Sequence, residues 1–377
     1  MNVVINTRPL TKHPQICQSN FIKECLLKII HTNPEYSFFF IADGIADKDL
    51  VSKNSSIIAA APKSANSLLW KIWYSYKLPS LLKKYKADVF VNIDSICSLK
   101  TNVPQCLVVP NLSMPGDSSF YKKNTAAFFK KVSLIITFSQ FVKNEICKTY
   151  KVATEKVEVI YTGAYDFFLP DNEKENIKER YTEGKEYFLF TGEINTANNL
   201  VNLLKAFSFF KKRQKSNMQL IIATTTISPN NAFIKSLNSY KYRNDVKLMV
   251  DMQEEELVKI IATAYAFVYA TEQNGFYVPV LQAMQCGIPV IVSNTPLMNE
   301  ICGDAALFTD PTIFENIADK MMLVFKDENR RNELIIKGKK QAAQFPLTLT
   351  NQSLWRSIVK CAGISVNTTT NTLSLPT

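Results

Sequence analysis

Histidine and glycine are scarce in this chain, and their scarcity excludes several kinds of site. Only two histidines occur in 377 residues, so a His-rich metal centre or a Ser-His-Asp triad has little material. With 10 glycines in total, the chain contains neither a P-loop nor a G-x-G-x-x-G turn. Metal-independent chemistry is therefore favoured, and no metal site is expected.

Long apolar runs and paired cysteine motifs are also missing. No run approaches 18 apolar residues, and the N-terminus opens on a strand-like Val3-Val4-Ile5 in place of a charged segment with an apolar core. The eight cysteines form no C-x-x-C pair, which is typical of reduced thiols. A cytoplasmic protein is the simplest expectation.

Positive charge is concentrated in the first half of the chain. The net charge is +11, and residues 1–170 carry 21 Lys+Arg against 12 Asp+Glu, whereas the rest carries 23 against 21. Such a field favours an anionic surface or substrate. Peripheral association with the inner face of the membrane, an anionic acceptor and a solvated face without a partner remain open. No motif supports nucleic acid.

The segment from Leu68 to Lys86 mixes tryptophan, tyrosine and lysine at helical spacing. It is compatible with a helix on a membrane surface and with a helix packed on a sheet, and Pro79 is expected to interrupt it. Two acidic patterns elsewhere carry less information. Asp47-Lys48-Asp49 fits an exposed loop, and the adjacent acids Glu254-Glu255-Glu256 fit the solvated first turn of a helix.

The alternation of strands and helices predicts two α/β domains. A chain of 377 residues exceeds the size at which single cores stop growing. Strands are expected at residues 2–6 and 38–42 with a helix at 20–30 between them, and a new strand at 187–191 follows a polar stretch. We predict a first domain at 1–166, a linker with a polar helix at 167–186, a second domain at 187–345, a helix within 346–363, and a disordered tail at 364–377.

The stretch from Ala262 to Pro311 reads as a strand-helix-strand-helix-strand unit. Pro279 opens one helix and Gly287 ends it, while Asn294 or Thr295 can cap a second that Gly303 ends. Such units build a parallel sheet whose strand ends face a ligand across helix N-termini. This stretch is therefore expected to hold the site.

The same stretch resembles the retaining glycosyltransferases of the GT-B fold, family 4. The matching residues are Gly275, Phe276, Pro279, Leu281, Ala283, Met284, Cys286, Gly287, Pro289, Val290, Glu300, Gly303-Asp304-Ala305-Ala306-Leu307 and Asp310-Pro311. The resemblance implies two Rossmann-like doubly wound domains that face each other across a cleft. It also implies an acceptor-binding first domain, a nucleotide-sugar-binding second domain, and a last helix that crosses back to the first.

The resemblance carries a donor site onto this chain. It implies donor contacts at the loop after strand 187–191, at the loop near 250–253, at the stretch around Gly275, and at the second helix start. The residues implied are Gly192, Asn198, Asn199, Asp251, Met252, Asn274, Gly275, Phe276, Tyr277, Gln282 and Thr295. Backbone N–H groups near Gly275 could meet the diphosphate without a charged side chain.

The family's charged groups are replaced in this chain. Asn274 and Gln282 stand where the family has two glutamates, and Ala197 and Asn198 stand where it has an Arg-Lys pair. Asn274 and Arg8 are the candidate catalytic residues. Lys12 and Glu272 are further candidates to replace the lost groups.

Arg8 has two interpretations. It follows the first strand, where a cation could face the cleft, and the alternative is a structural ion pair. In the catalytic interpretation, replacing Arg8 by Ala should lower turnover and leave the melting temperature nearly unchanged.

Two functions follow from the resemblance. The first is a retaining, metal-independent enzyme that transfers a hexose from a UDP- or GDP-linked donor to a glycan or lipid-linked acceptor in surface polysaccharide biosynthesis, without a cofactor. The alternative is an inactive homologue that binds a glycan, a nucleotide or a partner protein.

Overall fold

The protein is described by a computed structural model covering residues 1–8, 16–43, 48–59, 67–112, 119–164, 167, 169–195, 198–224, 232–272 and 277–364. The chain forms two compact units. The first comprises Met1–Pro14, Ser19–Tyr161 and Thr348–Thr377, and the second comprises Gln15–Gln18 and Thr162–Leu347. The boundary expected at residue 166 lies a few residues beyond this division, and nearly all of the tail expected at 364–377 lies outside the described residues.

The first unit is built on a seven-stranded parallel sheet with the order β3-β2-β1-β4-β5-β6-β7. Its strands are β1 (Asn2–Asn6), β2 (Ser37–Ala42), β3 (Ser55–Ala59), β4 (Val89–Asn92), β5 (Gln105–Val108), β6 (Leu134–Thr137) and β7 (Val157–Val159). The central strands are buried apolar runs, as a sheet covered on both faces requires. The order of the strands changes direction at β1: β2 and β3 follow on one side of it, and β4 to β7 follow on the other.

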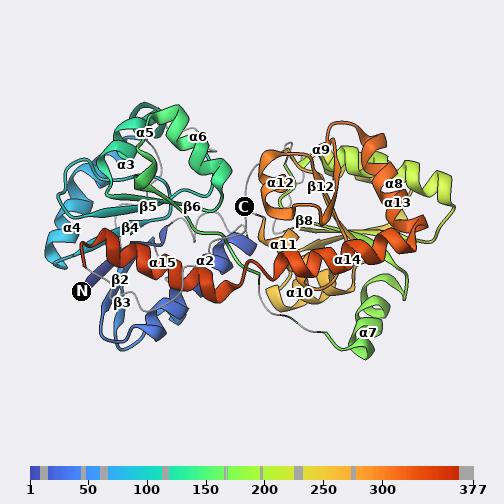
Figure 1. The fold of residues 1–377 in the computed structure, drawn as a ribbon, viewed down its shortest axis with the longest axis horizontal. Helices are drawn as coiled ribbons and strands as arrows, with labels where there is room; N and C mark the ends of the chain where they lie inside the picture. The colour runs from blue at the N-terminus through green and yellow to red at the C-terminus, as the bar shows by residue number, and fades with distance from the viewer. Residues whose placement is uncertain are drawn as a thin grey trace. The chain divides into compact units, whose positions relative to one another are not determined.

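Helices cover both faces of this sheet. They are α2 (Ile16–Thr32), α3 (Ser67–Ile72), α4 (Leu78–Lys84), α5 (Ser119–Lys131), α6 (Gln140–Tyr150) and α15 (Leu347–Cys361), with short 3₁₀ turns η1 (Lys48–Leu50) and η3 (Thr154–Lys156). Figure 1 shows α3, α5 and α6 along one face and α2 and α15 along the other. Ser139 caps α6 by accepting a hydrogen bond from the N–H of Val142 at 3.1 Å.

The aromatic segment around Pro79 is not interrupted, contrary to the sequence expectation. A π-helical turn, η2 (Trp73–Lys77), joins α3 directly to α4, whose first turn contains Pro79. Proline has no backbone N–H to donate. The wider π turn lets the helix continue past it without that hydrogen bond. The segment remains helical, and Trp73, Tyr74, Leu78 and Leu82 enter the core of the first unit.

The last helix, α15, belongs to the first unit. The ring of Trp355 lies 5.2 Å from that of Tyr36, and the hydroxyl of Thr350 donates to the backbone oxygen of Tyr161 at 2.8 Å. Ser357 and Lys360 both bond to the carboxylate of Glu158. The C-terminal helix is therefore held by aromatic and charged contacts together.

The second unit contains a six-stranded parallel sheet with the order β10-β9-β8-β11-β12-β13. Its strands are β8 (Tyr187–Thr191), β9 (Gln219–Thr224), β10 (Val246–Val250), β11 (Ala266–Tyr269), β12 (Val290–Ser293) and β13 (Ala306–Thr309). Its helices are α7 (Asp171–Thr182), α8 (Leu200–Gln214), α9 (Ala232–Asn238), α10 (Glu254–Thr263), α11 (Val278–Gln285), α12 (Pro296–Cys302), α13 (Phe314–Lys326) and α14 (Glu328–Ala342), with the 3₁₀ turn η5 (Arg243–Asp245).

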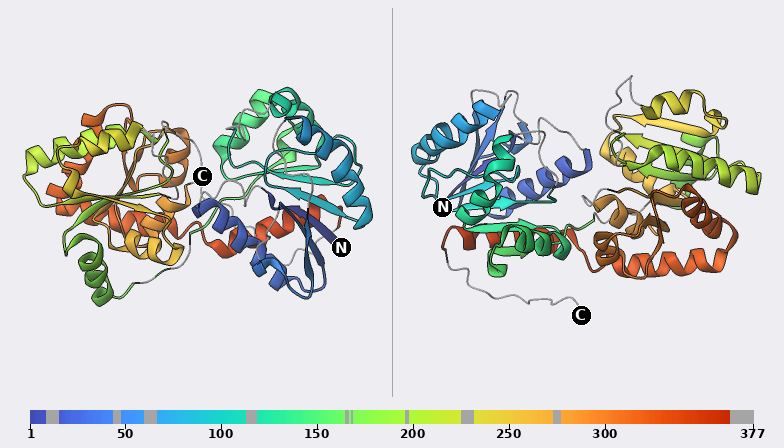
Figure 2. Two further views of the ribbon diagram at one scale, coloured as in Figure 1. Left: turned by 180° about the vertical axis from the view of Figure 1, so that it is seen from behind. Right: turned by 90° about the horizontal axis from the view of Figure 1, so that it is seen from above.

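The order of the second sheet creates a switch point between β8 and β11. Helices α8, α9 and α13 lie on one face, and α10, α11 and α14 lie on the other (Figures 1 and 2). In open α/β sheets, ligands bind beyond the carboxyl ends of the strands at such a point. The loops that follow β8 and β11 are therefore the place to seek a site in this unit.

Candidate functional site

The loop after β8 begins at a glycine that has little room for a side chain. Gly192 has φ +148°, and a Cβ there would lie 3.1 Å from Cζ of Phe190. Asn198 is buried, and its side chain donates to the backbone oxygen of Glu193 at 2.6 Å while its N–H donates to Oδ1 of Asn195 at 3.0 Å. Asn198 therefore holds the loop together through hydrogen bonds to its backbone and to Asn195.

Asn199 connects the two loops at the switch point. Its φ is +50°, a left-handed conformation that asparagine tolerates, and it precedes the first residue of α8. Its amide donates to Oε1 of Glu272 at 3.0 Å, across from β8 to the segment that follows β11. The exposed Glu272 carboxylate therefore lies at the edge where the resemblance implies a donor site, and hydrogen bonding orients it.

Asp251 and Met252 follow β10 at the same edge of the sheet. Asp251 is exposed with φ +54°, and its N–H donates to the backbone oxygen of Thr224 at 2.9 Å. Met252 is half-buried. The left-handed residue turns the chain from β10 toward α10 and leaves the Asp251 side chain at the surface.

Tyr277 and Gln282 are both buried in the second unit. The hydroxyl of Tyr277 accepts a hydrogen bond from the N–H of Thr162 at 3.1 Å, so this ring holds the segment where the chain enters the unit. The side-chain amide of Gln282 lies 3.6 Å from Sγ of Cys286 one turn along α11. Both side chains therefore contribute to the packing of α11.

The helix expected after Thr295 is confirmed. Thr295 is the N-cap of α12, its hydroxyl accepts from the N–H of Met298 at 3.3 Å, Pro296 is the first helical residue, and Gly303 ends the helix with φ +53°. Because Thr295 Oγ1 satisfies a helical N–H, its role here is capping.

Several candidates lie outside the described residues. These are Asn274, Gly275, Phe276, Ala197 and Lys12. Among the residues that the structure describes, no group of three or more His, Cys, Asp or Glu side chains is placed to hold a metal ion.

A buried polar cluster lies at the switch point of the first sheet. Asn6 at the end of β1 donates to Oδ1 of Asn92 at 2.8 Å and to Oδ2 of Asp94 at 3.2 Å. The hydroxyl of Tyr74 donates to Oδ2 of Asp94 at 2.7 Å and accepts from Asn92 at 2.9 Å. Ser95 follows in the left-handed region with φ +61°. Four polar side chains are thus fixed before any ligand binds.

Burial dominates the electrostatics of this cluster. It raises the pKa of Asp94 to about 6, although hydrogen bonds from Tyr74, Ile96 and Asn92 and the charge of Arg8 oppose the shift. The pKa of Tyr74 is raised well above its ordinary value by burial and by the neighbouring Asp94. Asp94 therefore changes its charge close to neutral pH.

Arg8 is buried beside this cluster. Its Nε lies 2.6 Å from Oδ1 of Asp43, and its guanidinium lies 4.6 Å from the centre of the Trp73 ring. The two paired side chains are 5% and 3% exposed. These contacts match the structural ion pair that was the alternative interpretation of Arg8.

The Asp94 cluster was missed from the sequence, although one signal could have revealed it. Asn92 and Asp94 are polar residues that end a buried apolar strand, as Asn6 and Arg8 do at the end of β1. Carboxyl ends of adjacent parallel strands meet at one edge of a sheet. However, the sequence does not show that β1 and β4 are neighbours; only the strand order of the folded sheet does.

Comparison with known proteins identifies the second unit. The family described as "Glycosyl transferases group 1" matches residues 171–341. The matched stretch lies within the second unit and makes up less than half of the chain. The chain is 24% identical over 229 residues to the O-antigen chain mannosyltransferase B of Escherichia coli, covering 60% of each chain. It is 28% identical over 255 residues to the O-antigen chain mannosyltransferase RfbU of Salmonella typhimurium, covering 64% of this chain and 67% of the relative.

The comparison of structures extends over both units. HepE of Anabaena, solved in complex with UDP and glucose, superposes with a TM-score of 0.76 at 14% identity and covers 96% of this chain and 100% of that one. Together with the two parallel sheets, this likeness shows a two-domain, Rossmann-like GT-B fold. The stretch matched by the family model lies in the second of these two domains.

Proposed function

We propose that this protein transfers a hexose from a nucleotide-sugar to a glycan or lipid-linked acceptor during assembly of a surface polysaccharide. The observation that carries the proposal is the group 1 glycosyl transferase match at residues 171–341, in a chain whose two relatives above are O-antigen mannosyltransferases. Mannose is therefore the first sugar to test. A non-catalytic binding role is not favoured, because those relatives are transferases.

The donor is proposed to bind at the switch point of the second unit. UDP is bound in HepE, which has the same fold. In this chain, Gly192 turns the backbone after β8 where the Phe190 ring leaves no room for a side chain, and the Asn199–Glu272 hydrogen bond ties the two loops beside it. Glu272 is a charged group at this edge that could meet a sugar hydroxyl.

The acceptor is proposed to bind at the Asp94 cluster of the first unit. Asn6, Tyr74, Asn92 and Asp94 are buried and hydrogen-bond to one another, so they would hold this edge of the sheet in a fixed arrangement beside a bound acceptor. Retention of configuration, metal independence and a cytoplasmic location belong to the same proposal.

Nucleotide binding is the first test. Calorimetry with UDP, GDP and ADP should give saturable binding of at least one diphosphate, and a transfer assay with mannose and glucose donors should then release it. Failure to bind any of the three diphosphates or their sugars would contradict the proposal.

The loop contact offers a sharper test. Glu272→Gln and Asn199→Ala each weaken a hydrogen bond worth about 1 kcal/mol, so each should lower kcat/KM roughly fivefold, with more if Glu272 also contacts the sugar. Glu315→Gln, an exposed change in α13, is the matched control and should leave kcat/KM unchanged. Equal effects at Glu272 and Glu315 would exclude this placement of the donor.

A further inference from the structure

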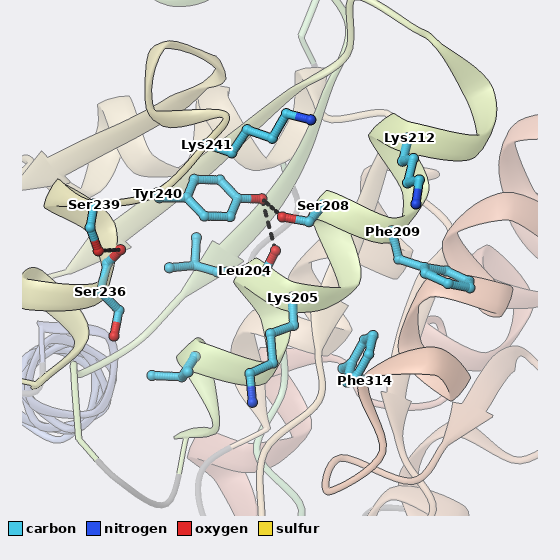
Figure 3. A pocket seen from close by; sticks show the side chains of 11 residues that line it. Leu204, Lys205, Ser208, Phe209, Lys212, Ser236, Ser239, Tyr240, Lys241 and Phe314 are labelled. Carbon is cyan, nitrogen blue, oxygen red and sulfur yellow. Dashed lines mark hydrogen bonds between the residues drawn. The ribbon is translucent and has the colours of Figure 1, made fainter.

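A groove of about 490 Å³ runs along the outer face of α8 in the second unit (Figure 3). It is lined by residues of α8, of α9 and the turn after it, and by the first residue of α13. Val201, Lys205, Ser208 and Lys212 follow one another at spacings of four, three and four, so they form a single stripe on α8.

Aromatic side chains flank this stripe on both sides. Figure 3 shows Phe209 and Phe314 on one side of α8 and Tyr240 on the other, and the two phenylalanine rings lie 6.1 Å apart in an edge-to-face arrangement. The hydroxyl of Tyr240 donates to the backbone oxygen of Leu204 at 2.8 Å and accepts from Ser208 at 2.9 Å. These contacts fix the walls of the groove in place.

Most residues of the groove come from a stretch of sequence whose charged side chains are all positive. Residues 200–244 contain eight Lys+Arg and no Asp or Glu. Lys205, Lys212 and Lys241 at the groove are exposed, and among the described residues none of the three forms an ion pair. Lys211, which points away from this surface, is by contrast buried and 3.0 Å from Asp245. The groove therefore combines apolar walls with uncompensated positive charge.

The groove extends along α8 away from the donor loops. Lys212 lies in the last turn of α8, and Tyr240 and Lys241 follow the end of α9. The donor loops precede α8 and α11, so Lys212 and Lys241 lie away from them, whereas Val201 and Lys205 line the end of the groove nearer to Asn199.

We propose that this groove binds a phosphate joined to an apolar group, with the phosphate held by Lys205, Lys212 and Lys241 and the apolar part placed against Phe209, Phe314 and Tyr240. Lysine ammonium groups bind phosphate as point charges, and the aromatic walls remove apolar surface from water. Both a membrane phospholipid and a free phosphorylated metabolite have this chemistry.

The test compares ligands that differ in one part. Dihexanoyl phosphatidic acid, below its micelle concentration, should bind at least tenfold more tightly than inorganic phosphate by calorimetry. Vesicles of phosphatidylcholine with and without phosphatidylglycerol separate the sources: preferential binding to the anionic vesicles that is lost on replacing Lys205, Lys212 and Lys241 supports the lipid, and binding of the short-chain compound alone supports a free metabolite.

A matched pair of triple variants assigns the site. Lys205→Glu with Lys212→Glu and Lys241→Glu should reduce the affinity for dihexanoyl phosphatidic acid at least tenfold. Lys148→Glu with Lys326→Glu and Lys340→Glu, the same charge change elsewhere, should reduce it far less. The unfolding transition of each variant reports folding. The proposal is overturned if both triples lose binding equally, if inorganic phosphate binds as well as the short-chain lipid, or if a DNA oligonucleotide displaces that lipid at equal concentration.

Discussion

The Arg8–Asp43 pair is a buried charge pair whose members depend on each other. Separated by 2.6 Å and almost fully buried, each group would be an uncompensated charge without its partner. Such a loss costs about 3–5 kcal/mol, whereas replacing both members by apolar residues of similar volume is often neutral.

Arg8→Ala is therefore expected to lower the melting temperature by roughly 6 °C or more, unlike the small change expected from the sequence. Arg8→Met combined with Asp43→Leu should recover most of the loss. Differential scanning calorimetry of the wild type, the two single variants and the double variant measures the coupling. A single Arg8→Ala variant that melts like the wild type would show that the pair contributes little to stability.

Asp94 makes stability depend on pH. Its folded-state pKa of about 6 exceeds the ordinary 3.8, so the folded state binds this proton more tightly than the unfolded state. Its contribution to the unfolding free energy should therefore fall by about 3 kcal/mol as pH rises from about 4 to 6, and stay low above that.

Asp94→Asn should remove this pH dependence, because asparagine does not ionise. Urea unfolding at several pH values between 4 and 7.5 tests it, with the exposed Asp319→Asn as the control. Parallel pH profiles for the wild type and Asp94→Asn would show that Asp94 titrates at its ordinary pKa.

At the scale of elements, the continuous α3-η2-α4 helix has one side packed in the core and another exposed to solvent. The sequence was compatible with packing on a sheet and with contact to a membrane, and did not say which residues would do each. Trp73, Tyr74 and Leu78 are buried in the core, whereas Ile72 and Tyr76 are 42% and 73% exposed. Lys71, Lys77, Lys83 and Lys84 share the exposed surface. We propose that this surface contacts anionic membrane. No described helix is long and apolar enough to cross one.

Ile72→Ser combined with Tyr76→Ser should weaken binding to anionic vesicles tenfold or more, because a fully buried apolar side chain contributes about 1.5–3 kcal/mol. Val51→Ser with Leu99→Ser, which changes exposed apolar residues elsewhere in the unit, is the matched control. Cosedimentation measures binding. Indistinguishable binding by the two double variants would exclude this surface.

Elements with strong apolar patterns were predicted well. The strands expected at 2–6 and 187–191 coincide with β1 and β8, and the helix expected at 20–30 lies within α2 at 16–32. Short elements were missed, among them β3 at 55–59 and α9 at 232–238. Five to seven residues include too few apolar positions to establish a period, and pairing with β2 stabilises β3.

At the scale of the whole molecule, the two chain segments that join the units run side by side. Ala164 pairs with Pro346, and a Cβ at Gly163 would lie 2.4 Å from the backbone nitrogen of Leu347 and 2.7 Å from the oxygen of Phe345. Only glycine allows the two backbones to approach this closely.

Gly163→Ala should therefore destabilise the protein by about 1–3 kcal/mol, because one of the two backbones must shift. Gly338→Ala, at a helical glycine whose added Cβ would lie 3.4 Å from Cγ of Met284, is the control and should not destabilise the protein. Thermal unfolding of both variants gives the comparison. If Gly163→Ala unfolds at the same temperature as the wild type, the two backbones can move apart without loss of stability, and the prediction is wrong.

The sequence alone determined the α/β alternation, the two parallel sheets and the resemblance to a glycosyltransferase family, because these depend on local apolar runs, turns and caps. Tertiary structure decided what the polar side chains do. Asn6 meets Asn92 across 86 positions of sequence, and Arg8 meets Asp43 from the next strand along the sheet. Such partners depend on strand order and burial, which bring distant residues together and set the pKa of Asp94, and no local pattern specifies them.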